Sequence, residues 1–294
     1  MKTALDNGAN FWNGAEFYGS PTANSLQLLN YYFTKHPEDK DKIVISIKGG
    51  FGAAGPDGSR QGIRNSIENC LKILDGKKAI EIFKPARVDP KVDIEDTVAA
   101  IAEYVKAGKI GGVGLSEVGA KTIRRAHAVY PISAVEVEYS LFSTDLQDNG
   151  VGATCAELGI PIVAYSPLSR GFLTGQVRSR DDIPEGDFRK SLPRFQPGIF
   201  DQNLVLVDEI EKISKKKGVT SAQTAIAWVR AQSEKPGLPT IIPIPGATKP
   251  ARVFENLAQV KLSDSELAEI QQVLDKIPIS GERYGGPLAK LMSL

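Results

Sequence analysis

The chain of 294 residues is long for one domain, although a single β/α barrel takes about 250 residues. Hydrophobic residues make up 41% and charged residues 24%, so an intrinsically disordered chain is excluded. The 36 Lys and Arg balance 35 Asp and Glu, which leaves no surplus of positive charge for binding nucleic acid, and no apolar run reaches the roughly 18 residues of a membrane span.

Histidine and cysteine are scarce in the sequence. His36 and His127 are too few for a histidine-rich metal site, so we expect no metal cofactor. Cys70 and Cys155 are too few for a disulfide framework and suit a reducing compartment. We therefore expect a cytoplasmic protein that could also enter the nucleus.

In chain order, the predicted elements begin with the end of a helix over residues 1–7, closed by Gly8. Short β-branched runs then alternate with amphipathic segments. These runs are too short and too apolar for an exposed antiparallel sheet. They predict seven buried strands, at residues 9–14, 43–47, 79–83, 110–115, 134–138, 160–164 and 240–244.

The segments between these runs carry helix signals. Asp93 is a good N-cap residue, and Gly108 ends the helical pattern that follows it. Ser263 and Glu266 form a capping box in front of another amphipathic helix. Alternation of strand and helix over this length predicts repeated right-handed βα units around a parallel sheet.

A doubly wound sheet and a barrel both fit this alternation. No linker or change of composition divides the chain, so we expect one domain over residues 1–294. Residues 176–201 are too many for a turn and are typical of a surface loop that covers an active site. The glycines from Gly50 to Gly55 match the dinucleotide motif G-x-G-x-x-G, but a Pro-Asp-Gly turn follows them before helical spacing starts near Arg60, so we interpret them as a loop.

Two side chains at predicted strand ends have complementary chemistry. Tyr18 follows the first strand and Lys48 ends the second. The pKa of a free phenol is near 10, and a neighbouring ammonium lowers it, so that the tyrosine can give a proton to a carbonyl oxygen while a hydride reaches the carbon. Spacing alone still favours an ordinary half-buried tyrosine and a lysine with a buried stem.

The segment from Asn10 to Gly19 resembles the aldo-keto reductase signature N-F-F-D-T-A-x-x-Y-G. Later blocks follow in the order of that family and extend the resemblance from Ala4 to about Lys276. They are Lys48-Gly49, Ala86-Arg87-Val88-Asp89, Gly114-Leu115-Ser116-Glu117, Glu136 to Ser140, Ala164 to Leu168 with Gly171 and Leu173 to Gly175, and Ile244-Pro245-Gly246 with Arg252, Glu255 and Asn256. Within the superfamily, the first block and Ala-Arg-Val-Asp are most similar to the fungal pyridoxal reductases.

The resemblance implies an α/β fold, the TIM (β/α)8-type barrel of these reductases, here lacking its first βα unit and so with seven parallel strands. It also implies that NADPH reduces a small-molecule aldehyde, most similar to the reduction of pyridoxal to pyridoxine. Tyr18 would be the general acid and Lys48 the group that lowers its pKa, while Asn13 and Ala86 replace the family's aspartate and histidine. Because Asn13 is uncharged, we expect the Lys48 charge to be uncompensated.

The resemblance also implies residues for substrate and cofactor. Ala86 leaves space for a pyridine ring, and the candidate substrate residues are Glu16, Lys84 and Arg87. In the first part of the cofactor set, Ser116, Glu117 and Glu136 would hold the nicotinamide carboxamide and Tyr165 would stack on the nicotinamide ring. The other cofactor-binding residues of this part are Ser166, Pro167, Leu168, Gly171 and Leu173. The second part would hold the adenosine 2′-phosphate and the adenine, and comprises Pro245, Gly246, Thr248, Arg252, Glu255 and Asn256, a set that favours NADP over NAD.

Other functions compete with reduction. Barrels of this family also occur as potassium-channel β-subunits, and the changes at Asn13 and Ala86 fit such a nucleotide-binding module, or an inactive truncated reductase. The presence of both Tyr18 and Lys48 favours the enzyme, since a nucleotide sensor needs neither. A metal-dependent hydrolase is excluded because the strand ends lack histidines and paired carboxylates.

Overall fold

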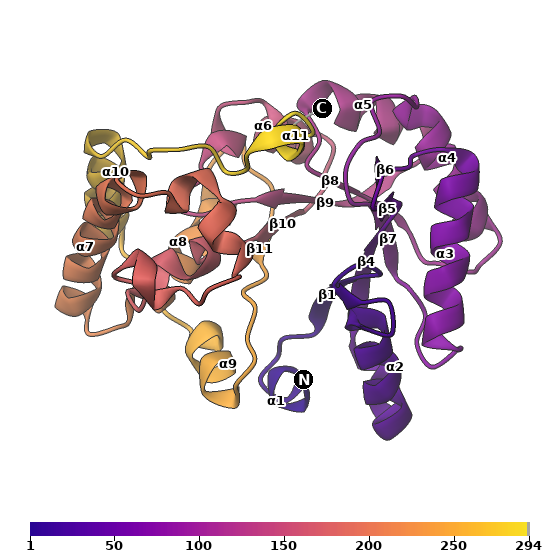
Figure 1. Cartoon of the computed structure of the whole chain (residues 1–294), viewed down its shortest axis with the longest axis horizontal. Helices are drawn as coiled ribbons and strands as arrows, with labels where there is room; N and C mark the ends of the chain where they lie inside the picture. Colours follow the sequence, from indigo (N-terminus) through magenta and orange to yellow (C-terminus); the bar gives the residue numbers. More distant parts are fainter. Residues whose placement is uncertain (293–294) are drawn as a thin grey trace. The chain divides into compact units, whose positions relative to one another are not determined.

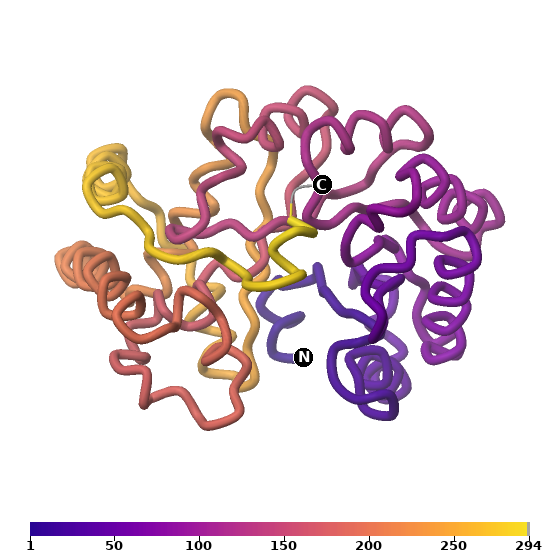
Figure 2. The backbone as a smooth tube through the Cα atoms, turned by 45° about the horizontal axis from the view of Figure 1, so that its top comes forward, coloured from indigo at the N-terminus to yellow at the C-terminus, as the bar shows by residue number. Residues whose placement is uncertain are grey.

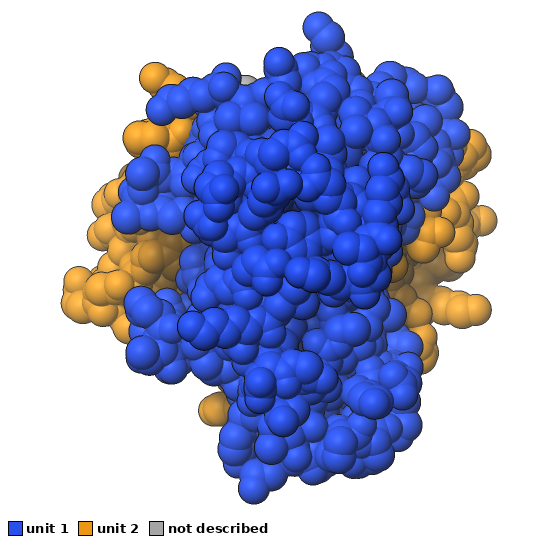
Figure 3. Space-filling view, turned by 90° about the vertical axis from the view of Figure 1, so that its right-hand side faces the viewer, with its two compact units in different colours: residues 1–137, 149–162, 291–294 blue, residues 138–148, 163–290 orange. Residues whose placement is uncertain are grey.

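The computed structural model describes residues 1–292. Its contacts divide the chain into two compact units, coloured separately in Figure 3. The first unit contains residues 1–137 and 149–162 with the chain end from residue 291, and the second unit contains residues 138–148 and 163–290. Figure 2 follows the backbone through both units. None of the helices between residues 1 and 292 has the length and apolar character needed to cross a membrane.

Seven strands form the main sheet, in the order β1-β4-β7-β8-β9-β10-β11, which is also their order in the chain (Figure 1). This confirms the prediction of seven strands. Their bounds are β1 Phe11–Ala15, β4 Val44–Gly49, β7 Ile82–Pro85, β8 Val113–Ser116, β9 Ile132–Glu138, β10 Ile162–Tyr165 and β11 Ile241–Pro243. The pairs from β1 to β9 are parallel, and their core side chains, such as Ile45, Ile47 and Leu115, are fully buried.

The parallel register aligns the carboxyl ends of these strands. Ala15 of β1 is the Cα partner of Lys48 of β4, and Lys48 is the partner of Lys84 of β7. Ser116 of β8 is the partner of Glu136 of β9. The strand ends in the first unit therefore carry polar residues side by side, which is where enzymes with this type of sheet hold their chemistry.

Helices of the first unit follow the strands and cover them. Helix α2 packs against β1, α3 against β4 and α4 against β8, while α5 contacts α4 and α6. Their bounds are α1 Lys2–Asp6, α2 Ser25–Lys35, α3 Arg60–Leu74, α4 Ile94–Lys106, α5 Ala120–Val129 and α6 Val151–Glu157. The predicted stops are confirmed, since Gly8 and Gly108 lie just beyond α1 and α4 with φ of 86° and 67°.

Two short antiparallel pairs were not among the predicted elements. Strands β2 (Gly19–Ser20) and β3 (Ala23–Asn24) pair directly after β1, and β5 (Phe51–Gly52) and β6 (Gly55–Pro56) pair after β4. The second pair contains the glycine-rich motif, and α3 starts at Arg60 behind it. The interpretation of that motif as a loop rather than a dinucleotide-binding turn is therefore confirmed.

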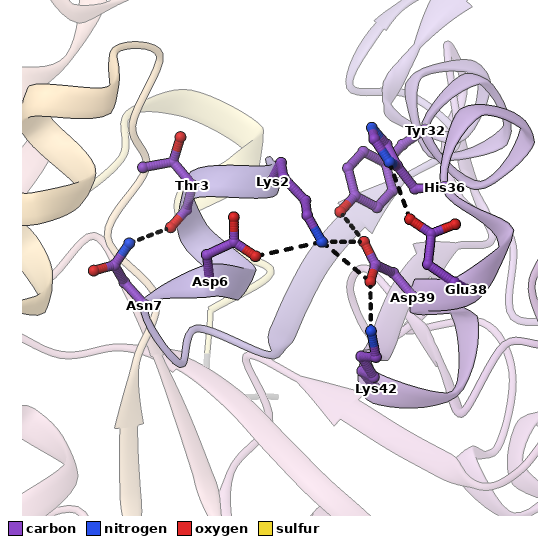
Figure 4. Close-up of polar contacts among 9 residues, drawn as sticks. All are labelled: Lys2, Thr3, Asp6, Asn7, Tyr32, His36, Glu38, Asp39 and Lys42. Carbon is purple, nitrogen blue, oxygen red and sulfur yellow. Dashed lines mark hydrogen bonds and ion pairs between the residues drawn. The ribbon is translucent and has the colours of Figure 1, made fainter.

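The Asp39 carboxylate ties the N-terminal helix to the first unit (Figure 4). Lys2 of α1 and Lys42 both donate to it, at 3.0 and 2.9 Å, and the Tyr32 hydroxyl donates at 2.8 Å. The hydrogen bond from Lys42, followed by those from Lys2 and Tyr32, lowers the pKa of Asp39 against the effect of burial. These ion pairs connect α1 to the segment Pro37–Lys42 between α2 and β4.

The second unit has a core of aromatic rings. Phe172 packs on Phe142, Phe195 and Phe200 with ring centroids 4.7–5.3 Å apart, and Tyr139 packs on Trp228 at 5.3 Å. The predicted loop at residues 176–201 contains short 3₁₀ turns up to Phe195, and its last three residues belong to the first turn of α7. The Ile183, Leu192 and Phe195 side chains are buried. The helices are α7 Ile199–Lys217, α8 Ser221–Ala231, α9 Pro250–Leu257, α10 Asp264–Lys276 and α11 Gly286–Ala289. The capping box of Ser263 and Glu266 in front of α10 is confirmed.

Candidate active site

Five polar side chains from four strands meet in the first unit. The Lys48 ammonium donates to Asn13 Oδ1 at 2.6 Å and to Glu136 Oε1 at 2.5 Å. Asn13 Nδ2 donates to Glu136 Oε2 at 2.5 Å. Lys84 Nζ lies 2.9 Å from the same Oε2 and donates to Ser46 Oγ at 2.5 Å. We call Asn13, Ser46, Lys48, Lys84 and Glu136 the lysine cluster.

The three charged residues of the lysine cluster are almost fully buried, with 3% of Lys48, 1% of Lys84 and 2% of Glu136 exposed, while Asn13 is half-buried. Burial alone would raise the pKa of Glu136, but the charges of Lys84 and Lys48 outweigh it and lower the pKa to about 2. Burial lowers the pKa of Lys48, against the attraction of Glu136. Burial also lowers the pKa of Lys84, to about 8, with Lys48 repelling its charge.

These contacts correct one expectation from the sequence. Asn13 was expected to leave the Lys48 charge uncompensated, but Glu136 supplies the carboxylate from β9. By the resemblance found in the sequence, Asn13 stands where the family has an aspartate and Glu136 where it has a glutamine, so the acid and the amide have exchanged places. Lys48 therefore still has one acidic partner. Ala86, in the place of the family's histidine, is 2% exposed and its backbone N–H donates to the Gly49 carbonyl at 2.9 Å.

Tyr18 lies beside the lysine cluster and is 47% exposed. Lys48 Nζ is 4.9 Å from the centroid of its ring. The backbone of Tyr18 is fixed by two hydrogen bonds, from its N–H to the Ala15 carbonyl and from the Ser25 N–H to its own carbonyl. Gly19 makes this turn possible, because a Cβ there would stand 2.3 Å from the Ala23 carbonyl oxygen at a φ of 121°.

The three candidate substrate residues have different surroundings. Glu16 accepts from the Gly50 N–H at 3.2 Å and from Asn69 Nδ2 at 3.0 Å, with Ser66 also donating to it. Arg87 Nη1 donates to the Ala86 carbonyl at 2.6 Å. Lys84 belongs to the lysine cluster, where its ammonium is already paired with Glu136 and Ser46.

The residues expected at the nicotinamide amide lie at the end of β8. Among the described residues, the buried Ser116 hydroxyl has no hydrogen-bond partner. Glu117 follows it with a φ of 51°, a strained value for a residue with a side chain, and its N–H donates to the Glu136 carbonyl at 2.9 Å. An orphaned hydroxyl beside a strained turn fits a site built to hydrogen-bond a carboxamide.

In the second unit, the residues after β10 form a tight, strained turn. Ser166, Ser169 and Arg170 have φ values of 51°, 49° and 55°, and Gly171 has 101°. The N–H groups of Gly171 and Leu173 both donate to the Leu168 carbonyl, while Pro167 and Leu173 are buried. The Tyr165 hydroxyl lies 3.1 Å from that of Tyr284.

A buried ion pair next to this turn was not predicted. Arg170 contacts both oxygens of Glu138, at 3.1 and 2.9 Å, and its guanidinium lies 4.8 Å from the centroid of the Tyr284 ring. Glu138 and Arg170 are 32 residues apart in the chain, so no local pattern in the sequence indicates that the two will pair.

Helix α9 carries the residues expected at the adenosine end. Arg252 is the third residue of α9, and its Nη1 donates to Glu255 Oε2 at 2.5 Å. Asn256 is 7% exposed. Pro245 is half-buried, while Gly246 and Thr248 are exposed in the segment between β11 and α9. Helix α9 begins at Pro250, directly after this segment.

Comparison with known proteins decides the family. The model of the aldo/keto reductase family matches residues 1–275. The chain belongs to the aldo/keto reductase family. This match covers nearly all of the described residues and confirms the resemblance found in the sequence motifs.

Two relatives and one solved structure are similar to this chain over most of its length. Probable pyridoxal reductase 2 of Schizosaccharomyces pombe is 42% identical over 306 residues, which cover 100% of this chain and 90% of that protein. The aldo-keto reductase yakc (NADP(+)) of the same organism is 39% identical, covering 96% of this chain and 83% of that protein. A solved structure, the glycerol dehydrogenase AKR11B4 of Gluconobacter oxydans, matches with a TM-score of 0.82 at 23% identity over 96% of this chain and 85% of that one, which confirms the reductase fold.

Proposed function

We propose that this chain reduces an aldehyde to an alcohol with NADPH, with pyridoxal, reduced to pyridoxine, as its substrate. Membership of the aldo/keto reductase family supports oxidoreduction of a small carbonyl compound. The 42% identity to a probable pyridoxal reductase supports the choice of pyridoxal, and the 39% identity to an NADP(+) aldo-keto reductase supports the choice of nucleotide. We further propose that residues 1–294 work as one reductase domain in the reducing environment of the cytoplasm.

The observation that carries the proposal is the contact between Tyr18 and the lysine cluster. Aldehyde reduction adds a hydride to the carbonyl carbon and a proton to the oxygen, giving the alcohol. NADPH, when bound, supplies the hydride and becomes NADP⁺. Tyr18 gives its phenolic proton to the oxygen, and the Lys48 ammonium, 4.9 Å from its ring centroid, stabilises the phenolate that remains.

Asn13 and Glu136 fix the Lys48 ammonium for this role. Their oxygens accept from Nζ at 2.6 and 2.5 Å, so the ammonium is held in one position. A positioned cation does not need to reorganise when negative charge develops on the phenol. The proton lost from Tyr18 is replaced from solvent, which the half-exposed ring can reach.

The chain has residues that fit the nucleotide. The unpartnered Ser116 hydroxyl and the strained Glu117 would hold the carboxamide together with Glu136, and Tyr165 would stack on the nicotinamide ring. The turn of Ser166, Pro167, Leu168, Gly171 and Leu173 would contact the phosphates. Arg252 would pair with the 2′-phosphate, and the residues that complete this end are Pro245, Gly246, Thr248, Glu255 and Asn256.

We propose the substrate contacts from the chemistry of the residues around Tyr18. Ala86 has no side chain that could donate to the carbonyl, which leaves Tyr18 as the donor to its oxygen. Arg87 is the cation we propose for the phenolate oxygen of pyridoxal, since Lys84 is committed to Glu136. Glu16 is held by Ser66, Asn69 and the Gly50 N–H, and would shape the site through that network.

Steady-state oxidation of NADPH in the presence of pyridoxal tests the proposal. The wild-type chain is expected to turn over, and Tyr18→Phe is expected to lower kcat by about 10²–10⁴-fold, because the general acid is lost while the ring is kept. Tyr31→Phe is the matched control, since Tyr31 is exposed on α2 and should leave kcat unchanged. A Tyr18→Phe chain with full activity would refute the role of Tyr18, and a wild-type chain that binds NADPH without turnover would favour the nucleotide-binding module.

A further inference from the structure

We propose that Lys84 is a positioning residue, which shares the Glu136 carboxylate with Lys48 and so determines how much positive charge acts on Tyr18. This inference rests on the proposed function in one respect, namely that Tyr18 is the proton donor. It adds a second lysine to the site, in a role different from contact with the substrate.

Strand register places the two lysines side by side. Lys48 of β4 and Lys84 of β7 are Cα partners in the parallel sheet, and both ammonium groups reach Glu136 of β9. Lys48 contacts Oε1 at 2.5 Å and Lys84 contacts Oε2 at 2.9 Å. The Lys84 ammonium also donates a hydrogen bond to Ser46 Oγ.

One carboxylate cannot neutralise two ammonium groups. With both lysines protonated and Glu136 ionised, the lysine cluster carries one net positive charge. Because these side chains are at most 3% exposed, water screens their charges weakly and each one is felt by its neighbours. Because Lys84 also pairs with Glu136, the carboxylate neutralises less of the Lys48 charge. More positive charge therefore acts on Tyr18.

The groups that face Lys84 come from three strands. Glu136 on β9 attracts its charge and Lys48 on β4 repels it, while Asn13 on β1 is neutral. Arg87, after β7, acts on Lys48 and lowers its pKa.

Substitutions that change the cluster's charge by known amounts test this proposal. Lys84→Met removes one positive charge, Glu136→Gln adds one by removing the carboxylate, and the double variant restores the original net charge. The pKa of Tyr18 is measured without nucleotide, from the pH dependence of the absorbance at 295 nm. For each chain, the titration of the same chain carrying Tyr18→Phe is subtracted, which leaves the signal of Tyr18. The alkaline limb of kcat for pyridoxal reduction is the second readout.

We expect Lys84→Met to raise the pKa of Tyr18, and with it the alkaline limb, by about one unit, because a nearby charge shifts a pKa by about that amount or more. Glu136→Gln should lower it, and the double variant should return it to near the wild-type value. Lys78→Met is the control, since Lys78 is equally buried but is paired with Glu81, and it should cause no shift. If Lys84→Met does not fold, Lys84→Gln gives the same comparison.

An unchanged Tyr18 pKa in Lys84→Met, or an equal shift in Lys78→Met, would overturn the inference. Loss of kcat without any movement of the pH profile would also overturn it, since a merely structural lysine gives that result. A wild-type chain that does not reduce pyridoxal would instead count against the proposed function, while the titration at 295 nm would still decide the role of Lys84.

Discussion

A single carboxylate, that of Glu136, stands between two buried ammonium groups. Buried charges are costly unless each is paired and hydrogen-bonded. Glu136 accepts from Lys48 and Asn13 and pairs with Lys84, and the two lysines lower its pKa to about 2. At the scale of residues, the carboxylate thus contributes to the stability of the first unit as well as to its chemistry.

Glu136→Gln is therefore expected to lower the free energy of unfolding at pH 7 by roughly 3 kcal/mol, because it leaves two buried ammonium groups without an anion. The folded-state pKa lies below the ordinary value of 4.5, so this contribution is present above that pH and is lost as pH falls toward 2. Urea unfolding at pH 7 and pH 3 checks both points. Glu95→Gln, at an exposed ion pair with Arg125, should cost less than about 1 kcal/mol, and an equal loss in both variants would contradict the account.

The sequence did not predict the pairing of Lys48 with Glu136. Taken alone, Asn13 in place of an aspartate removes a negative charge. Glu136 in place of a glutamine removes a hydrogen-bond donor. Their contact shows that together they keep one carboxylate beside Lys48. Lys48 and Glu136 are 88 residues apart, so only the register of the sheet reveals the exchange.

At the scale of elements, α9 presents Arg252 in its first turn. The N-terminal end of a helix attracts anions, and an arginine there can bind a phosphate through two N–H groups. In the described chain, Arg252 is paired with Glu255 and its side chain is 42% exposed. A guanidinium in this position is available to a phosphate that displaces or joins the carboxylate.

Arg252→Ala is expected to raise the KM for NADPH about tenfold and to leave the KM for NADH nearly unchanged, since only NADPH carries the 2′-phosphate. Initial rates with each nucleotide measure this difference. Arg125→Ala, on the exposed face of α5, serves as the control. An equal rise in KM for NADPH and for NADH in Arg252→Ala would show that α9 does not bind the 2′-phosphate.

Elements with local signals were predicted accurately. The start of α10 at its capping box and the stops of α1 and α4 at glycines depend on a few neighbouring residues. Strand limits depend on the partner instead: the run at residues 79–83 became β7 at Ile82–Pro85, because Ile82 pairs with Ser46 of β4. The antiparallel pair β2–β3 was missed, since two-residue strands leave no periodic pattern.

At the scale of the whole molecule, the order of the strands follows the order of the chain. Repeated right-handed βα units produce this order, which is why alternation and the family motifs sufficed to predict the fold. The family match extends through residues of both units. What the fold adds to the motifs is the set of contacts between strand ends, and the lysine cluster is the clearest case.

The central claim is that the Lys48 ammonium acidifies the phenol of Tyr18. Its most direct test is the titration of Tyr18 at 295 nm in the wild-type chain and in Lys48→Met, each compared with its Tyr18→Phe counterpart. The account predicts that Tyr18 ionises at least about one unit below the ordinary phenol value of 10 in the wild type, and that its pKa moves up to 10 or above in Lys48→Met. The same Tyr18 pKa in both chains would contradict it.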